Sequence, residues 1–79
     1  MSITLLEYIK VILQKVSFDA KLFEKELRKA LRQLLLPAEV KELKLWCYAQ
    51  FGKVYYRILR RCFATVRMRK LRIAYSNLW

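Results

Sequence analysis

Apolar side chains recur every three or four positions along most of the chain, which is the spacing of amphipathic helices. In the first stretch the inward face is predicted to be Leu5, Ile9, Ile12 and Val16, widened by Ile3, Leu6 and Leu13. In residues 19–34 the predicted stripe is Phe23, Leu27, Ala30, Leu31 and Leu34. Strict alternation with period two and hairpin turn signals are both absent from the sequence, so no strands are expected.

The second half of the chain repeats this helical pattern twice. A third helix is predicted from Pro37, with inward residues Val40, Leu43, Trp46, Cys47 and Phe51. A fourth is predicted after Gly52, with inward residues Tyr55, Ile58, Leu59, Cys62 and Val66. The sequence therefore predicts an all-α fold: a single domain, residues 1–79, built as a bundle of about four short amphipathic helices.

A few residues mark where these helices begin and end. Pro37 suits the first turn of a helix, and Gly52 suits the left-handed position just after a helix. Asp19 is a good N-cap, and Phe18 before it is predicted to pack on Phe23 as a hydrophobic staple. Residues 69–79 either extend the fourth helix or form a flexible basic tail, and the sequence leaves both open.

Charge is distributed very unevenly along the chain. Seventeen Lys and Arg oppose six Asp and Glu, a formal net charge of +11. Residues 1–42 hold eight basic and six acidic side chains, whereas residues 43–79 hold nine basic and no acidic ones. With 57% apolar residues the chain is too hydrophobic to be a disordered basic tail. The asymmetry indicates a folded protein with a polyanionic partner.

The predicted binding surface lies on the fourth helix and beyond it. Lys53, Arg57, Arg60 and Arg61 share one helical face, away from Tyr55, Ile58 and Cys62, and Arg67 continues the row. Arg69, Lys70 and Arg72 follow beyond it and complete the predicted surface. Cations near a helix C-terminus also favour the macrodipole, but that does not explain Lys53 at the predicted helix start. Tyr56 is adjacent to Arg57 and is a candidate for stacking on a base. Tyr48, Tyr75 and Trp79 are further aromatic candidates, whereas Phe18, Phe23, Phe51 and Trp46 are assigned to the core.

Nucleic acid is the partner class that this pattern favours, and RNA or a ribonucleoprotein is favoured over DNA. Arginine forks bind phosphates bidentately and stack on bases. Residues 36–63 can also be arranged as a helix-turn-helix DNA reader, with Lys53 to Arg61 as the recognition helix. Against this, Tyr48 is large where the motif needs a small residue, and the recognition helix has no Asn or Gln to read adenine.

Two other classes of function stay open. The high apolar content favours a helical protein–protein interaction or assembly module, such as a homodimer, which is the main alternative and is compatible with nucleic-acid binding. Attachment of the basic helix to an anionic membrane surface is a weaker alternative. Glu7 and Lys10 interrupt the apolar N-terminus, which also has no basic segment before it, so a cytoplasmic protein without a signal peptide is expected.

Catalysis, cofactors and small-molecule substrates are not expected. The chain has no His to activate a nucleophile or bind zinc, and its single Gly excludes a glycine-rich phosphate loop. Without His, the positive charge should hardly change between about pH 5 and 8. Cys47 and Cys62 are interpreted as buried thiols of a reducing compartment, although Arg60 and Arg61 beside Cys62 leave a redox-active thiol open.

Overall fold

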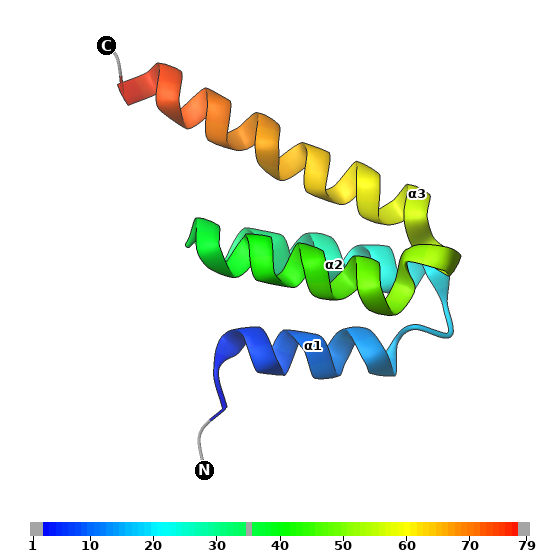
Figure 1. The fold of residues 1–79 in the computed structure, drawn as a ribbon. Helices are drawn as coiled ribbons and strands as arrows, with labels where there is room; N and C mark the ends of the chain where they lie inside the picture. Colours follow the sequence, from blue (N-terminus) through cyan, green and yellow to red (C-terminus); the bar gives the residue numbers. More distant parts are fainter. Residues whose placement is uncertain (1–2, 35, 78–79) are drawn as a thin grey trace.

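The computed structural model shows a single chain folded into packed helices (Figure 1). The structure describes residues 3–34 and 36–77, with the side chains of residues 3–34 and 36–65. Helix α1 spans Leu5–Lys15, α2 spans Ala20–Gln33 and α3 spans Pro37–Asn77, and no strand occurs in these ranges. The predicted all-α class is confirmed. The predicted number of about four helices is wrong, because the last two are joined into α3.

Each helix begins at a residue suited to a helix N-terminus. At α1, Thr4 and Glu7 form a capping box, each side chain accepting from the other residue's backbone N–H. At α2, the Asp19 carboxylate accepts from the backbone N–H groups of Lys21 and Leu22, as predicted. Helix α3 begins at Pro37, also as predicted.

Phe18 does not form the predicted staple. Its side chain is 79% exposed, whereas Phe23 is fully buried. Phe23 stacks instead on Tyr55, with 4.7 Å between ring centroids, and meets Phe51 edge-on at 4.9 Å. The ring of Phe23 thus packs against α3, which leaves Phe18 outside the core.

Helix α3 is sharply bent. A straight helix of its 41 residues would be about 62 Å long, but the longest dimension of the molecule is 44 Å. The backbone leaves helical geometry at Tyr55, with φ −118° and ψ 29°. The rings of Tyr48 and Phe63, on opposite sides of the bend, have centroids 6.4 Å apart. Residues 37–54 form a first arm and residues 56–77 a second arm that doubles back along it (Figure 1).

The bend lies three residues beyond the predicted break. Gly52 is part of α3 and does not have a positive φ, so it is not a left-handed helix cap. The contacts of Tyr55 account for the position of the bend. Its ring stacks on Phe23, and its hydroxyl donates to the backbone carbonyl of Ser17 in the α1–α2 turn. Tertiary contacts of Tyr55 with α2 and the α1–α2 turn, rather than the glycine, therefore account for where α3 bends.

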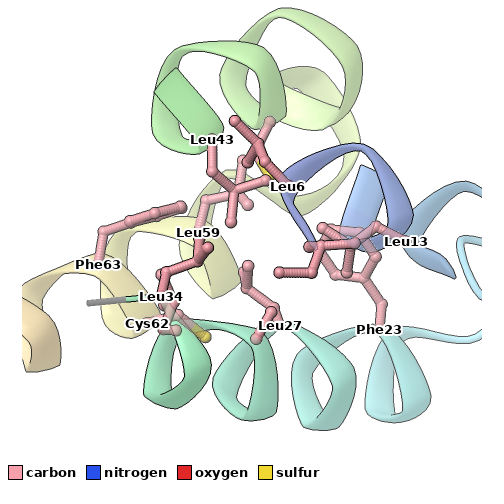
Figure 2. Packing of buried hydrophobic residues seen from close by; sticks show 13 residues of the cluster. Leu6, Leu13, Phe23, Leu27, Leu34, Leu43, Leu59, Cys62 and Phe63 are labelled. Atoms are coloured by element: carbon pink, nitrogen blue, oxygen red, sulfur yellow. The ribbon is translucent and has the colours of Figure 1, made fainter. Parts of the chain in front are cut away.

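All three helices contribute to one core (Figure 2). The buried residues are Leu6, Ile9, Leu13, Phe23, Leu27, Ala30, Leu31, Leu34, Leu43, Cys47, Leu59, Cys62 and Phe63. The stripe predicted for α2 is confirmed in full. Val40, Trp46, Phe51, Tyr55 and Ile58 are partly buried against this core, as predicted. Val66 lies in α3, and its side chain is outside the described part.

The inward face of α1 differs from the prediction. Leu6, Ile9 and Leu13 are buried, but Leu5 is 44% exposed and Ile3 is 57% exposed. The apolar arc of this helix is wider than the surface that α2 and α3 cover, so the sequence pattern did not define which edge faces inward. The uncovered edge keeps apolar side chains at the surface.

Candidate nucleic-acid interface

The predicted cations of α3 lie on both sides of the bend. Lys53 is in the last turn of the first arm, and Arg57, Arg60 and Arg61 are in the first turns of the second arm. All four side chains are exposed. Lys53 therefore does not lie at the helix start that the sequence predicted, and a cation in the last turn of a helical arm is favourable for the macrodipole.

Arg57 and Arg60, which follow the bend, differ from Lys53 in their surroundings. Arg57 lies in the first turn of the second arm, where a positive charge is unfavourable for the helix macrodipole, and Arg60 follows in the next turn. Among the described side chains neither forms an ion pair. No acidic residue follows Glu42 in the sequence, so the second arm has none of its own. Their charge does not stabilise the helix, which is the property expected of residues that serve a partner.

Arg61 is different, because it binds an acid from another helix. Its Nη2 lies 3.1 Å from Oε1 of Glu24 in α2. The other carboxylate oxygen of Glu24 receives two hydrogen bonds from Arg28, with the Nη2 atom at 2.9 Å. The Glu24–Arg28 pair has the i,i+4 spacing of a helical ion pair, whereas the Glu24–Arg61 pair joins residues 37 positions apart and left no signal in the sequence. The Glu24 carboxylate thus links the second arm to α2 and partly neutralises the charge of Arg61.

An open hollow lies at the bend. It has a volume of about 530 Å³ and is lined by Ala20, Lys53, Val54, Tyr55, Tyr56, Arg57, Ile58 and Arg61. Four of the predicted site residues, Lys53, Tyr56, Arg57 and Arg61, are therefore brought to one place. Arg60 is not part of its lining. The hollow depends on the bend, so the sequence pattern alone could not reveal it.

Tyr56 is available at the surface. Its side chain is 52% exposed, and its ring meets that of Tyr48 edge-on with 5.9 Å between centroids. Tyr48 itself is half-buried between Tyr56 and Phe63. The accessible ring of Tyr56 thus packs against the half-buried ring of Tyr48.

The C-terminal members of the predicted surface are only partly described. Helix α3 continues to Asn77 and includes Arg67, Arg69, Lys70 and Arg72. Residues 69–77 therefore extend the helix and do not form the alternative flexible tail. The side chains of these four basic residues, and that of Tyr75, are outside the described part of the structure, and Trp79 is outside it altogether. Their role in binding stays a prediction.

The two cysteines are buried free thiols. The pKa of Cys47 is raised to about 12, mainly by burial. The neighbouring Cys62 also raises this pKa, and Lys10 lowers it by a smaller amount. Burial also raises the pKa of Cys62, although Arg28 and Arg61 act in the opposite direction. A raised pKa keeps the thiol protonated and unreactive, which argues against the redox alternative.

The described residues contain no group of three or more side chains that could hold a metal ion. The helices of residues 3–34 and 36–77 also lack a stretch that is long and apolar enough to cross a bilayer.

Comparisons with known proteins add no relative. No protein-family model, no curated protein and no solved structure matches this chain.

Proposed function

We propose that this protein binds nucleic acid, RNA or a ribonucleoprotein in preference to DNA, through the basic second arm of α3 and the residues at the bend. The observation that carries the proposal is the pair Arg57 and Arg60, which are exposed and form no ion pair among the described side chains; Arg57 also lies in the first turn of the second arm, where cations are disfavoured. Binding acts through phosphate neutralisation and release of counterions.

The choice of nucleic acid over other anions rests on residue type. Of the eight basic residues after Gly52, only Lys53 and Lys70 are lysines. The guanidinium group presents a rigid fork that suits phosphate oxygens and also stacks on bases. No His is present, so this charge persists across the neutral range and binding should be nearly independent of pH.

Two features favour RNA over a helix-turn-helix mode on DNA. Gly52 is helical and does not form the turn that this motif needs. The two arms of α3 also pack along each other, with Tyr48 against Phe63, and an exposed aromatic ring lies beside Arg57. Exposed aromatics among arginines are typical of proteins that bind unpaired RNA bases.

The test begins with protein purified without nuclease. We expect an ultraviolet spectrum with excess absorbance at the nucleic-acid maximum, which RNase removes and DNase does not. Binding of the cleaned protein to RNA should then weaken steeply with salt, and replacing Arg57 and Arg60 by Gln should reduce the slope of log K against log salt by roughly 0.7 each for a single strand. DNA in place of RNA would favour the helix-turn-helix alternative. Affinity for RNA and DNA that does not change with salt would refute the proposal.

A second proposal, self-association through α1, is favoured by its uncovered edge. Leu5, Tyr8 and Val11 are 44%, 52% and 41% exposed, so α1 keeps apolar side chains at the surface. Oppositely charged residues, Glu7 and Lys15, lie in the first and last turns of this helix. In an antiparallel pair of α1 helices centred on Val11, Glu7 of each copy lies at the same level along the helix axis as Lys15 of the other. A second copy is the occupant that fits this self-complementary edge.

Sedimentation equilibrium tests this second proposal. We expect a mass that rises from one chain toward two with concentration, and a monomer for the double variant Leu5→Gln/Val11→Gln. The control is Leu45→Gln, which changes a 63% exposed leucine on the first arm of α3 and should leave the association unchanged. A wild-type mass of one chain at all concentrations would contradict the proposal.

A further inference from the structure

The hollow at the bend brings an aromatic ring, cations and apolar side chains together. It has an accessible ring in Tyr56, two cations without an ion pair among the described side chains, Lys53 and Arg57, and apolar lining from Ala20, Val54 and Ile58. Its volume of about 530 Å³ is within the usual range for sites that hold one small organic group.

The ring of Tyr56 is held in place by its neighbours. It meets the half-buried Tyr48 edge-on, and Tyr48 in turn packs near Phe63 of the second arm. Tyr55, the next residue along the chain, is fixed by its stack on Phe23 and its hydrogen bond to the Ser17 carbonyl. A ring that is fixed before binding loses little conformational freedom when a base stacks on it.

The charges around the ring are placed for phosphates. Lys53 and Arg57 are exposed on either side of the bend, and neither binds an acid among the described side chains. Arg61 lines the same hollow but is held by Glu24, so its guanidinium is fixed at the side of α2. Free cations beside an aromatic ring match the alternating charged and aromatic parts of a nucleotide.

Resting on the proposed nucleic-acid function, we infer that the hollow at the bend is a subsite for an unpaired nucleotide, with its base stacked on Tyr56 and its flanking phosphates bound by Lys53 and Arg57. The ligand class is therefore a single strand, loop or bulge. In a duplex each base is paired and stacked inside the helix, so its face cannot reach the ring without being turned out. The remaining arginines contact the backbone on either side and do not distinguish the two forms.

The experiment measures binding to fluorescent oligouridylate, and to the duplex that it forms with oligoadenylate, at one fixed low salt concentration. The variants are Tyr56→Ala and Tyr56→Phe, with Leu45→Ala as the control for loss of an exposed apolar side chain on the first arm. We expect Tyr56→Ala to weaken single-strand binding by roughly 5- to 150-fold and to leave duplex binding unchanged. Tyr56→Phe keeps the ring and should restore wild-type affinity, and Leu45→Ala should have no effect.

The outcomes separate this inference from the proposed function. Salt-dependent binding that Tyr56→Ala does not weaken, or weakens equally for single strand and duplex, would overturn the subsite while leaving the basic arm as a binding surface. A failure of the wild-type protein to bind either form would overturn both. Circular dichroism of Tyr56→Ala, expected to equal that of the wild-type protein because the ring is half-exposed, separates lost binding from lost folding.

Discussion

The contact between Glu24 and Arg61 leads to a prediction in which stability and binding change in opposite directions. Glu24→Gln removes the charge that holds Arg28 at 2.9 Å and Arg61 at 3.1 Å. The folded state loses two ion pairs, but Arg61 gains freedom to bind a phosphate. We therefore expect the variant to be less stable and to bind RNA more tightly than the wild-type protein.

The size of each effect follows from the geometry. The pair with Arg28 has the i,i+4 spacing and contributes about 0.3–0.5 kcal/mol. The pair with Arg61 is discounted because the arginine side chain is 63% exposed, so it contributes about 0.5 kcal/mol. Their sum, near 1 kcal/mol, corresponds to a fall in Tm of about 4–8 °C in a domain of this size. One further phosphate contact steepens the slope of log K against log salt by about 0.7 on a single strand. The ratio of the variant's RNA affinity to that of the wild-type protein therefore grows about 2.6-fold as salt falls from about 200 to 50 mM.

The assay pairs thermal unfolding with RNA binding at several salt concentrations. The matched control is Glu26→Gln, which makes the same charge change two residues away on α2, where Glu26 forms no ion pair among the described side chains. The control should raise affinity slightly, through net charge, with little loss of stability. Equal effects of the two variants on both quantities would refute the assigned role of Glu24.

Three further predictions concern the bend and the core. Gly52→Ala should stabilise the fold by about 0.4–1 kcal/mol in urea unfolding, because Gly52 is helical and an added Cβ would meet only Tyr48 Cδ1 at 3.9 Å; a clear loss of stability would mean that a glycine is required there. Tyr55→Phe should cost about 1 kcal/mol by removing the hydrogen bond to the Ser17 carbonyl while keeping the stack on Phe23, and Tyr8→Phe, at a half-exposed ring, should change stability by less than about 0.5 kcal/mol. The pKa of the Cys47 thiol is about 12 in the folded protein and near 9 ordinarily, so between these pH values the thiol loses its proton in the unfolded chain but not in the folded one. The free energy of unfolding should therefore fall as pH rises from 9 to 12. In Cys47→Ala that fall should be shallower, by up to about 1.4 kcal/mol per pH unit, and an identical pH dependence would contradict the assignment.

Local signals predicted much of this fold. The Asp19 cap, the start of α3 at Pro37 and the α2 stripe from Phe23 to Leu34 follow from the residues within a few positions of each other. Each depends on helix periodicity or on the free amides of one helix end. Such features are fixed by the chain itself, so the sequence is enough to place them.

The features that sequence reasoning missed depend on contacts between distant residues. The bend is at Tyr55 and not at Gly52, because Phe23 and the Ser17 carbonyl bind the tyrosine. Phe18 points away from the core although its neighbour pattern predicts a staple. The wide apolar arc of α1 could be turned inward in more than one way. Propensity and periodicity do not contain this information, because tertiary packing decides between the alternatives.

The candidate site shows the same division. The row of arginines was evident from the charge distribution, and Arg57 and Arg60 are exposed as expected. The hollow beside Tyr56 and the restraint of Arg61 by Glu24 both require the second arm to double back toward α2. The sequence could therefore predict which residues bind, but not that they form a shaped subsite.

The central claim is that Arg57 and Arg60 bind phosphates, and the salt dependence of RNA affinity tests it most directly. The measurement compares Arg57→Gln/Arg60→Gln with Lys25→Gln/Lys29→Gln, which removes the same charge from exposed positions of α2. We predict that the arginine variant lowers the slope of log K against log salt by about 1.4 on a single strand, whereas the lysine variant leaves the slope unchanged. Equal slopes for the two variants would contradict the account.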